Sequence, residues 1–367
     1  LLEGAIAAPP ASTNCDEPAF WLYTSGSTGL PKGAIHLHHD IWVAADCWGQ
    51  RTMGMSPNHV HLSASKLYFA YGLGNSLHCP MWSGGSAVLV HNRPTPSNMT
   101  EAIAANKVTH FYAVPSFYSA MMADDGFSAA IAAGLYSSLE VCVSAGEALP
   151  APLCDRWMKA TGVPVLDGIG STELLHIFIA NRPNDIRPGC TGRPIWGYDA
   201  RVVNEDGNDV APDVVGDLWV CGDSACIGYW NRHEATKRAL RGKWFVTGDK
   251  YRVDSEGYYW YAGRSDDMFK VHGQWVSPLK VESVLLEHEG VREVAVVAAT
   301  DDRGLSCGLA FVVPVGLANE SLALALLEHA AGNLSPYLVP ATVKFVDELP
   351  KTATGKIQRY LLRDQTG

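Results

Sequence analysis

A run of glycine and hydroxyl residues near the start of the chain has the composition of a phosphate-binding loop. Residues 23–33 read Tyr-Thr-Ser-Gly-Ser-Thr-Gly-Leu-Pro-Lys-Gly. Glycines let backbone N–H groups crowd around an anion, hydroxyls donate further hydrogen bonds, and a lysine adds a point charge. The residues that we expect to hold phosphate are Thr24, Ser25, Gly26, Ser27, Thr28, Gly29 and Lys32.

This loop is not the Walker A loop of P-loop NTPases. Pro31 precedes the lysine where that motif requires glycine, and Gly33 follows it where serine or threonine is required. The alternative interpretation is a surface hairpin rich in turn residues. The density of hydroxyls and glycines around a single lysine favours the phosphate loop over that alternative.

Five further motifs place carboxylates and cations beside glycine and hydroxyl residues. Carboxylate oxygens suit Mg²⁺ and hydroxyl donors, whereas cations suit phosphate. Taken singly, Glu173 could be a helix-start carboxylate, Asp249 a turn residue and Lys356 a solvated lysine. The motifs are Ser-Ala-Gly-Glu at 144–147, Asp-Gly-Ile-Gly-Ser-Thr-Glu at 167–173, Trp-Phe-Val-Thr-Gly-Asp at 244–249, Tyr-Ala-Gly-Arg-Ser-Asp-Asp at 261–267 and Pro-Lys-Thr-Ala-Thr-Gly-Lys at 350–356.

Together with the loop at 23–33, these motifs resemble those of the adenylate-forming superfamily. That superfamily includes acyl- and aryl-CoA ligases, non-ribosomal peptide adenylation domains and luciferases. The resemblance extends over residues 20–360 and keeps the family's motif order. It implies that ATP, Mg²⁺ and coenzyme A are used. A carboxylic acid would become an acyl-adenylate with release of pyrophosphate, and the acyl group would then pass to coenzyme A with release of AMP.

The resemblance also implies roles for individual residues of this chain. Thr172, Glu173 and Lys356 would be catalytic, with Thr172 bonded to phosphate and Glu173 the ligand of Mg²⁺. Lys356 would reach the α-phosphate and the substrate carboxylate together, and Asp249 would accept hydrogen bonds from both ribose hydroxyls. The other residues implied to bind ATP are Ala145, Gly146, Glu147, Asp167, Gly168, Ile169 and Arg264.

A hinge is implied at Asp266, where a small domain would rotate between two half-reactions. In one orientation Lys356 enters the site. In the other, the segment 270–275 would face it, and Gly273 and Gln274 would admit the coenzyme A thiol. The alternative is a rigid two-domain packing with an ordinary turn at Asp266.

Two segments, 66–75 and 170–178, resemble the benzoate–CoA ligase branch of the superfamily. By that resemblance Ala70, Tyr71, His176 and Ile177 would line a pocket for benzoate or a substituted benzoate. Tyr71 can present its ring to an aromatic substrate, and His176 can meet the carboxylate. The alternatives are a satisfied core histidine at 176 and ordinary core packing at Tyr71.

The elements that must position these motifs form an α/β large domain and a small α+β domain. Apolar runs at 87–90, 110–114, 139–143 and 163–166 predict strands, and helices are expected at 41–49, 98–106, 115–122 and 151–161. This alternation predicts a sheet that is at least partly parallel. Short strands at 200–204, 216–221, 244–247 and 258–261 predict a mostly antiparallel β segment.

We place the domain boundary between residues 264 and 265, giving an AMP-binding large domain (1–264) and a mobile C-terminal domain (265–367). Proline at position 278 after Ser277 predicts a helix start. Strands at 291–300, 308–313 and 342–346 and a helix at 321–334 complete the small domain. The family carries a further α/β subdomain before its phosphate loop. Only 22 residues precede Tyr23 and there is no initiator Met, so we expect this chain to lack that first subdomain.

Composition narrows the class of protein. The net charge of −10 argues against a nucleic-acid partner, and no apolar run of 18 residues indicates a membrane span. Nine scattered cysteines without a Cys-x-x-Cys pair are typical of reduced, mostly core-filling thiols in the cytoplasm. The run His36-Leu37-His38-His39-Asp40 lacks a recognised metal-ligand spacing, so we do not interpret it as a metal site. A homodimer is compatible with the sequence.

Three functions remain to be compared. The first is an acid–thiol ligase that forms an aryl-CoA from benzoate or a ring-substituted benzoate. The second is an adenylation module that loads a carrier protein instead of coenzyme A. The third is a non-catalytic nucleotide-binding fragment that lacks the first subdomain.

Overall fold

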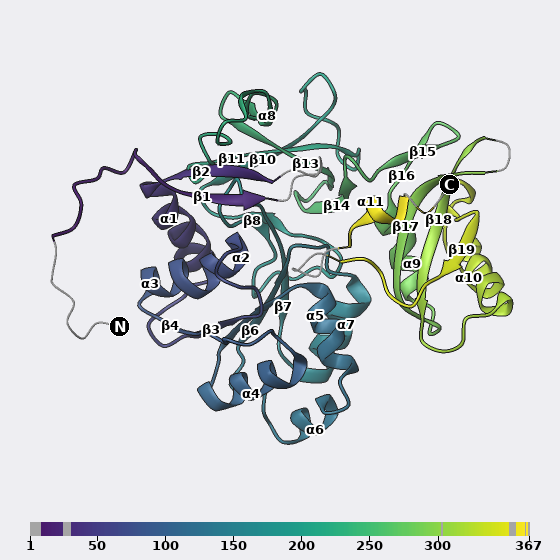
Figure 1. Ribbon diagram of the computed structural model, residues 1–367, viewed down its shortest axis with the longest axis horizontal. Coiled ribbons are helices and arrows are strands. Elements are labelled where there is room, and N and C mark those ends of the chain that lie inside the picture. The colour runs from purple at the N-terminus through teal and green to yellow at the C-terminus, as the bar shows by residue number, and fades with distance from the viewer. Residues whose placement is uncertain (1–8, 25–30, 302–303, 352–356, 364, 366–367) are drawn as a thin grey trace.

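The computed structural model describes residues 9–24, 31–301, 304–351, 357–363 and 365. Figure 1 shows the larger N-terminal part on the left and the smaller C-terminal part on the right. The larger part is built around a sheet with the strand order β4-β3-β5-β6-β7-β8-β9. These strands are β3 (Val60–Ser63), β4 (Ser86–Val88), β5 (His110–Ala113), β6 (Val141–Ala145), β7 (Val165–Gly170), β8 (Ile177–Ala180) and β9 (Arg193–Pro194).

The prediction of a partly parallel sheet is confirmed. Strands β3 to β7 pair in parallel, whereas β8 runs antiparallel to both β7 and β9. Helices expected in the connections are present as α4 (Pro96–Asn106), α5 (Pro115–Ala123) and α7 (Ala151–Thr161), with the short α6 (Phe127–Ala132) after α5. Pro96 begins α4 after the cap Thr95, and α7 ends at Gly162, which takes a left-handed φ of 73°.

The sheet is covered on both faces, as its continuous apolar strands require. Successive side chains of a strand point to opposite faces. Phe111 and Cys142 therefore pack in one core with Trp157 of α7, whereas Tyr112 and Val143 pack in a second core with Trp48. Two cores of this kind explain why the central strands carry almost no exposed side chains.

The second face is covered by two helical segments that the sequence predicted only in part. The helix expected at 41–49 is α1 (His38–Ala44) followed by a π-helical stretch η1 (Ala45–Thr52). A second π-helical stretch, η2 (Gly74–His78), lies between α2 (Ala70–Leu73) and α3 (Cys79–Ser83). π-helical turns are rare and recur at functional sites, and both segments here border the candidate substrate residues.

A mostly antiparallel β layer follows, as predicted. It contains β10 (Tyr198–Val203), β11 (Gly216–Gly222), β12 (Leu240–Arg241), β13 (Trp244–Val253) and β14 (Tyr259–Arg264), with α8 (His233–Ala239) between β11 and β12. The hairpin of β1 (Pro18–Thr24) and β2 (Lys32–Leu37) joins this layer, because Ile35 N–H donates to the Gly228 carbonyl and Trp230 N–H to the Gly33 carbonyl.

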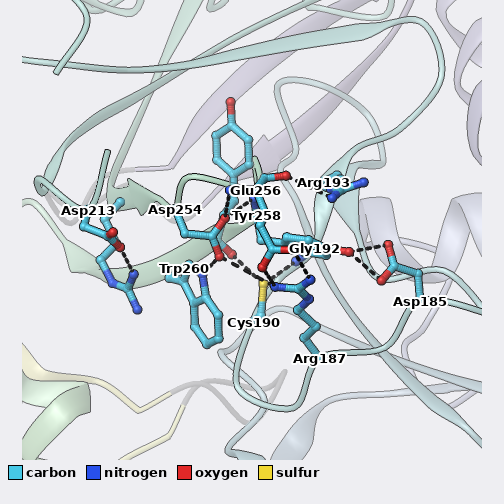
Figure 2. A network of polar contacts seen from close by, with 12 residues as sticks. Asp185, Arg187, Cys190, Gly192, Arg193, Asp213, Asp254, Glu256, Tyr258 and Trp260 are labelled. Atoms are coloured by element: carbon cyan, nitrogen blue, oxygen red, sulfur yellow. Dashed lines mark hydrogen bonds and ion pairs between the residues drawn. The ribbon is translucent and has the colours of Figure 1, made fainter. Parts of the chain in front are cut away.

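A polar network fastens the β layer to the main sheet (Figure 2). The ring of Tyr258 lies between two guanidinium groups, with Arg187 at 3.5 Å and Arg193 at 4.0 Å from its centroid. The Tyr258 hydroxyl donates to Asp185, and Arg187 donates to Glu256 at 2.8 Å. The segment between β8 and β9 is thereby tied to the turn between β13 and β14, which fixes β13 relative to β8.

The C-terminal part has its own apolar core, formed by residues between Phe269 and Phe345. Its elements are β15 (Phe269–Val271), β16 (Gln274–Val276), α9 (Pro278–Leu286), β17 (Val291–Thr300), β18 (Ser306–Pro314), α10 (Glu320–Asn333), η3 (Pro336–Leu338), β19 (Thr342–Phe345) and α11 (Arg359–Arg363). The helix start at Pro278 and the predicted strands and helix of this part are confirmed. The short β15–β16 hairpin and α11 were not predicted.

Most of the cysteines fill the core, as expected, whereas Cys15 is exposed and Cys221 and Cys307 are half-buried. All nine are unpaired, and Cys47, Cys79, Cys142, Cys154, Cys190 and Cys226 are buried. Burial raises the pKa of these buried thiols, so they are held in the unreactive thiol form. Within the described part of the chain, none of the helices has the length and apolar character needed to span a membrane.

Candidate active site

The Gly-rich loop connects the two strands of the β1–β2 hairpin. Thr24 at the end of β1 pairs with Lys32 at the start of β2. Ser25, Gly26, Ser27, Thr28 and Gly29 lie outside the described residues. The Nζ atom of Lys32 lies 5.2 Å from the ring centroid of Tyr229, within range of a cation–π contact. Both a phosphate-binding loop and a surface hairpin rich in turn residues could connect two paired strands, so the β1–β2 pairing does not decide between these two interpretations.

Tyr229 also contacts Glu173, so it connects Lys32 of the Gly-rich loop to the motif at 167–173. The Tyr229 hydroxyl donates to Glu173 Oε1 at 2.8 Å. Burial, followed by the charge of Glu173, raises the pKa of Tyr229, so its hydroxyl stays protonated and donates. The result is a row in which Lys32, Tyr229 and Glu173 follow one another. Tyr229 was missed by the sequence reasoning, because it lies in none of the recognised motifs.

Thr172 and Glu173 lie in the turn between β7 and β8. The interpretation of Glu173 as a helix-start carboxylate is wrong, because residues 171–176 form turns and bends and lead directly into a strand. The turn is tight enough that Leu175 has a φ of 65°. The backbone carbonyl of Glu173 accepts from Cys226 N–H at 2.7 Å, which anchors the turn to the β layer.

Asp249 and Arg264 face each other across β13 and β14. Their registered positions are paired, and Arg264 Nη1 lies 3.0 Å from Asp249 Oδ1. Asp249 is therefore a strand residue, and the turn interpretation is wrong. Burial alone would lower the pKa of Arg264, but the charge and hydrogen bond of Asp249, together with Tyr261 and Asp266, raise that pKa overall. Gly248 has a φ of 76°, and a Cβ there would lie 3.1 Å from the Arg264 guanidinium, so glycine suits the position.

The motifs at 144–147 and 167–173, which are expected to bind ATP, meet at the carboxyl edge of the parallel sheet. Ala145 ends β6 and pairs with Gly168 of β7, so Gly146 and Glu147 directly follow the end of the strand that pairs with β7. In open α/β sheets this edge is where ligands bind. Asp167 is different, because its side chain is buried and burial raises its pKa well above the usual range. The backbone near Gly146 and Gly168 is therefore the better candidate for nucleotide contact.

The four residues expected to line the aryl pocket come together around the β7–β8 turn. The Tyr71 and His176 rings are 6.3 Å apart. Ile177 begins β8 and packs in the same core as Trp48, while Ala70 packs against Leu175. Tyr71 donates its hydroxyl to the Val143 carbonyl at 2.9 Å, which fixes the ring.

His176 is buried without any hydrogen-bond partner. Its side chain is 3% exposed, and neither ring nitrogen has a partner among the described residues. Burial, with a smaller contribution from His78, lowers the pKa of His176 to about 3, so the imidazole is neutral at pH 7. The interpretation of a satisfied core histidine is therefore wrong. A buried polar group without a partner costs roughly 1–3 kcal/mol, which calls for a functional explanation.

The surroundings of His176 include residues that the sequence reasoning missed. Trp48 of η1 stacks on the imidazole, with centroids 6.0 Å apart and an interplanar angle of 27°. Gly74 of η2 also lies against the imidazole, and a Cβ there would be 1.8 Å from His176 Cδ2. The closely spaced Gly72 and Gly74 were the available signal, since paired glycines indicate close packing.

The residues implied to act from the small domain lie in separate places. Asp266 is exposed, and its carbonyl accepts from Arg363 at 2.9 Å. Gly273, with a φ of 79°, and Gln274 lie at the exposed turn of the β15–β16 hairpin. Lys356 lies outside the described residues. Among the residues that are described, no group of three or more His, Cys, Asp or Glu side chains is arranged to hold a metal ion.

This fold and these motifs define an enzyme class: the chain belongs to the AMP-binding enzyme family. Residues 3–230 match that family and residues 280–356 match its C-terminal domain. The chain is 45% identical to a benzoate–CoA ligase of Thauera aromatica, covering 99% of this chain and 69% of the relative. It is 42% identical to a 4-hydroxybenzoate–CoA/benzoate–CoA ligase of Rhodopseudomonas palustris, covering 97% and 66%.

Solved structures give the same result. An anthranilate CoA ligase in complex with anthranoyl-AMP superposes with a TM-score of 0.93 at 40% identity, covering 98% of this chain and 69% of that one. A benzoate CoA ligase from Burkholderia xenovorans LB400 superposes with a TM-score of 0.90 at 42% identity, covering 98% and 71%. A p-hydroxybenzoic acid–AMP ligase of Mycobacterium tuberculosis is 38% identical, covering 96% of this chain and 49% of the relative. The chain thus spans about two thirds of the length of the CoA ligases it matches.

Proposed function

We propose that the protein activates benzoate or a ring-substituted benzoate with ATP and transfers the acyl group to coenzyme A. One observation carries the choice of substrate: a buried imidazole without a partner among the described residues contacts two aromatic rings, three residues after Glu173. Planar aromatic surroundings suit an aryl ring. The substrates named for the relatives in Thauera and Rhodopseudomonas support the same class of acid.

The reaction has two balanced steps. A carboxylate oxygen of the substrate attacks the α-phosphorus of ATP, the bond to the β-phosphate bridging oxygen breaks, and pyrophosphate leaves. The coenzyme A thiolate then attacks the acyl carbon, a thioester bond forms, and AMP leaves with its electron pair. Both transition states gather negative charge, so fixed cations and N–H donors supply most of the stabilisation.

Separate groups of residues would bind ATP and the aromatic acid. Lys32 and Thr172, with the Gly-rich loop, hold phosphate oxygens, and Asp249, kept in place by Arg264, accepts from the ribose hydroxyls. His176 meets the substrate carboxylate, while Tyr71, Ala70 and Ile177 surround the ring. A neutral imidazole has one N–H to donate, and a carboxylate needs such a donor.

Glu173 fits the magnesium ion that adenylate chemistry requires. Mg²⁺ is bound by one or two carboxylates together with phosphate oxygens, rather than by a protein cage. The single oriented carboxylate of Glu173 matches that preference, and the absence of a larger acidic group in the described residues does not conflict with it. When bound, the ion would neutralise charge on the phosphates.

The C-terminal part would act as a mobile domain. We place the boundary between residues 264 and 265 and the hinge at Asp266, with Lys356 serving the adenylation step and Gly273 and Gln274 the coenzyme A step. The separate apolar core of residues 269–345 supports movement as a unit. We also infer a cytoplasmic location, which the nine unpaired cysteines support.

A second candidate is adenylation without transfer to coenzyme A. The similarity to a p-hydroxybenzoic acid–AMP ligase favours considering it. A carrier protein would then receive the acyl group.

The decisive experiment is ATP–pyrophosphate exchange with a panel of carboxylic acids, followed by addition of coenzyme A. We expect exchange with benzoate and its hydroxy or amino derivatives, and release of AMP and an aryl-CoA when coenzyme A is added. Exchange confined to fatty or amino acids would contradict the substrate class. Exchange without aryl-CoA would favour the second candidate, and no exchange with any acid would favour a non-catalytic fragment.

A further inference from the structure

We propose that His36 is a positioning residue, which fixes the turn carrying Thr172 and Glu173 against the strand that follows the Gly-rich loop. This inference rests on the proposed function, because it assumes that Thr172 and Glu173 act on ATP. None of the recognised motifs includes His36, and the run that contains it was considered only as a metal site. The geometry assigns it a different role.

His36 bridges two parts of the chain that are distant in sequence. It lies on β2, four residues after Lys32, and its side chain is fully buried. Its Nε2 atom is 2.8 Å from the backbone carbonyl oxygen of Thr172. A carbonyl oxygen only accepts hydrogen bonds, so Nε2 carries a proton and donates it.

Asp40 holds the other side of the ring. Its Oδ2 atom is 2.8 Å from His36 Nδ1 and also accepts from the backbone N–H of Leu37 at 3.1 Å. The imidazole of His36 is thus held at both of its nitrogen atoms. Phe20 stacks on the ring at 5.4 Å and completes its enclosure.

The two other histidines near the His36–Asp40 pair, His39 and His78, do not bond the Thr172 carbonyl in place of His36. His39 lies 3.3 Å from Asp40 Oδ1 and contacts the Asp223 carbonyl at 2.8 Å, so it faces outward to the β layer. The ring of His78 lies 6.4 Å from that of Phe20, and burial lowers the pKa of His78 to about 4, which keeps it neutral. His36 is thus the imidazole that joins β2 to the Thr172 carbonyl.

Contacts with the β layer hold the residues after Thr172, because Cys226 N–H donates to the Glu173 carbonyl and the Ser224 hydroxyl donates to the Leu174 carbonyl, each at 2.7 Å, while His36 holds the Thr172 carbonyl from the side of β2. The backbone of this turn is neither strand nor helix, and Leu175 takes a left-handed φ. The Thr172 hydroxyl and the Glu173 carboxylate depend on that backbone for their direction. A displacement of about 1 Å at a reacting group can cost about 100-fold in rate, so a donor that fixes the turn acts on catalysis without touching substrate.

Two isosteric variants separate the two bonds of His36. Glutamine can place an amide N–H close to where Nε2 lies, so H36Q keeps the donor to Thr172. Asparagine places its amide near Nδ1, so H36N keeps the side facing Asp40 and loses the donor to Thr172. The matched control is H329N, because His329 Nε2 makes the same kind of bond, 3.0 Å from the Val284 carbonyl, in the C-terminal part.

We expect H36N to lower kcat for benzoate-dependent pyrophosphate exchange about 10- to 100-fold, with KM for benzoate changed less than about 2-fold. H36Q should keep kcat within about 5-fold of the unchanged protein, and H329N should leave it unchanged. Equal losses in H36N and H36Q, or a loss confined to the benzoate KM, would overturn the proposal.

Amide hydrogen exchange over residues 171–177, without ligand, tests the same bond independently of activity. It should accelerate in H36N, but not in H36Q or H329N. One outcome is that the unchanged protein shows no ATP–pyrophosphate exchange with any aromatic acid while hydrogen exchange is still faster in H36N alone. In that case the proposed function fails and the positioning role of His36 stands. If hydrogen exchange in this segment is the same in all variants, the positioning role is refuted whatever the activity.

Discussion

Substitution of Gly74 by alanine is the sharpest test of the aryl site, because it alters the site without removing any polar group. The added Cβ would lie 1.8 Å from Cδ2 and 2.3 Å from Nε2 of His176. Both distances are far below van der Waals contact. The ring is held by Trp48 on one side, so it cannot simply slide away. Either the imidazole rotates out of the site or η2 shifts.

The magnitude follows from two opposing effects. Overpacking a close-packed interior costs about 1–3 kcal/mol. Replacing glycine by alanine in a helical segment contributes about 0.5–1 kcal/mol in the other direction. We therefore expect a net loss of about 1–2 kcal/mol in the free energy of unfolding. The displaced His176 should raise KM for benzoate at least about 10-fold, while KM for ATP changes little.

The assay combines urea unfolding with steady-state exchange kinetics. Gly332→Ala is the matched control, since Gly332 lies in α10 and a Cβ there meets nothing within 4 Å. That variant should gain about 0.5–1 kcal/mol and keep both KM values. Combining Gly74→Ala with His176→Ala should restore most of the stability, but not benzoate activation. The reasoning is refuted if Gly74→Ala alone is as stable as the control and binds benzoate normally.

Two further predictions follow from the same structure, and a third follows from the motif at residues 350–356. Burial lowers the pKa of both His110 and His176 to about 3, so below about pH 6.5 the unfolded chain takes up protons that the folded protein does not, and stability should be lost as the pH falls from about 6.5 toward 4. His110→Gln should reduce the slope of the unfolding free energy against pH by up to about 1.4 kcal/mol per pH unit. An unchanged slope in that variant would contradict this account. Tyr229→Phe removes the hydroxyl that donates to Glu173, so it should raise KM for ATP about 5- to 10-fold and leave KM for benzoate unchanged. A change confined to KM for benzoate would show that Tyr229 does not act through Glu173. Lys356→Ala should abolish adenylation yet spare thioester formation from supplied benzoyl-AMP, and an equal loss of both steps would argue against the two orientations of the small domain.

The α/β core was predictable because its signals are local. Apolar runs marked the central strands, and the helices expected at 98–106, 115–122 and 151–161 were found as α4, α5 and α7 with ends within two residues of those bounds. The π-helical stretches were not predictable, because they change the backbone spacing within a segment whose apolar pattern still reads as a helix. A hairpin at the Gly-rich loop was considered from the sequence only as the alternative to phosphate binding, and its attachment to the β layer could not be predicted because Gly228 and Trp230 lie far away in the sequence.

Motif residues could be identified from the sequence, but their partners could not. Thr172, Glu173 and Asp249 stand in recognisable runs. Tyr229 and His36 contact them from distant segments, and tertiary contacts of this kind leave no local pattern. Likewise, nothing near His176 indicated that both of its nitrogens would lack partners, because satisfaction of a buried polar group depends on the whole surrounding fold.

The attachment of the β1–β2 hairpin has a consequence for the order in which the protein is made. The strands β3 to β7 pair with strands close to them in sequence, so this sheet can grow as the chain leaves the ribosome. The hairpin is made earlier, yet its partners Gly228 and Trp230 emerge much later, as does Tyr229. The hairpin edge must wait unpaired during synthesis, and unpaired edges invite aggregation. Nascent chains that stall before residue 228 should therefore be the ones that depend most on chaperones.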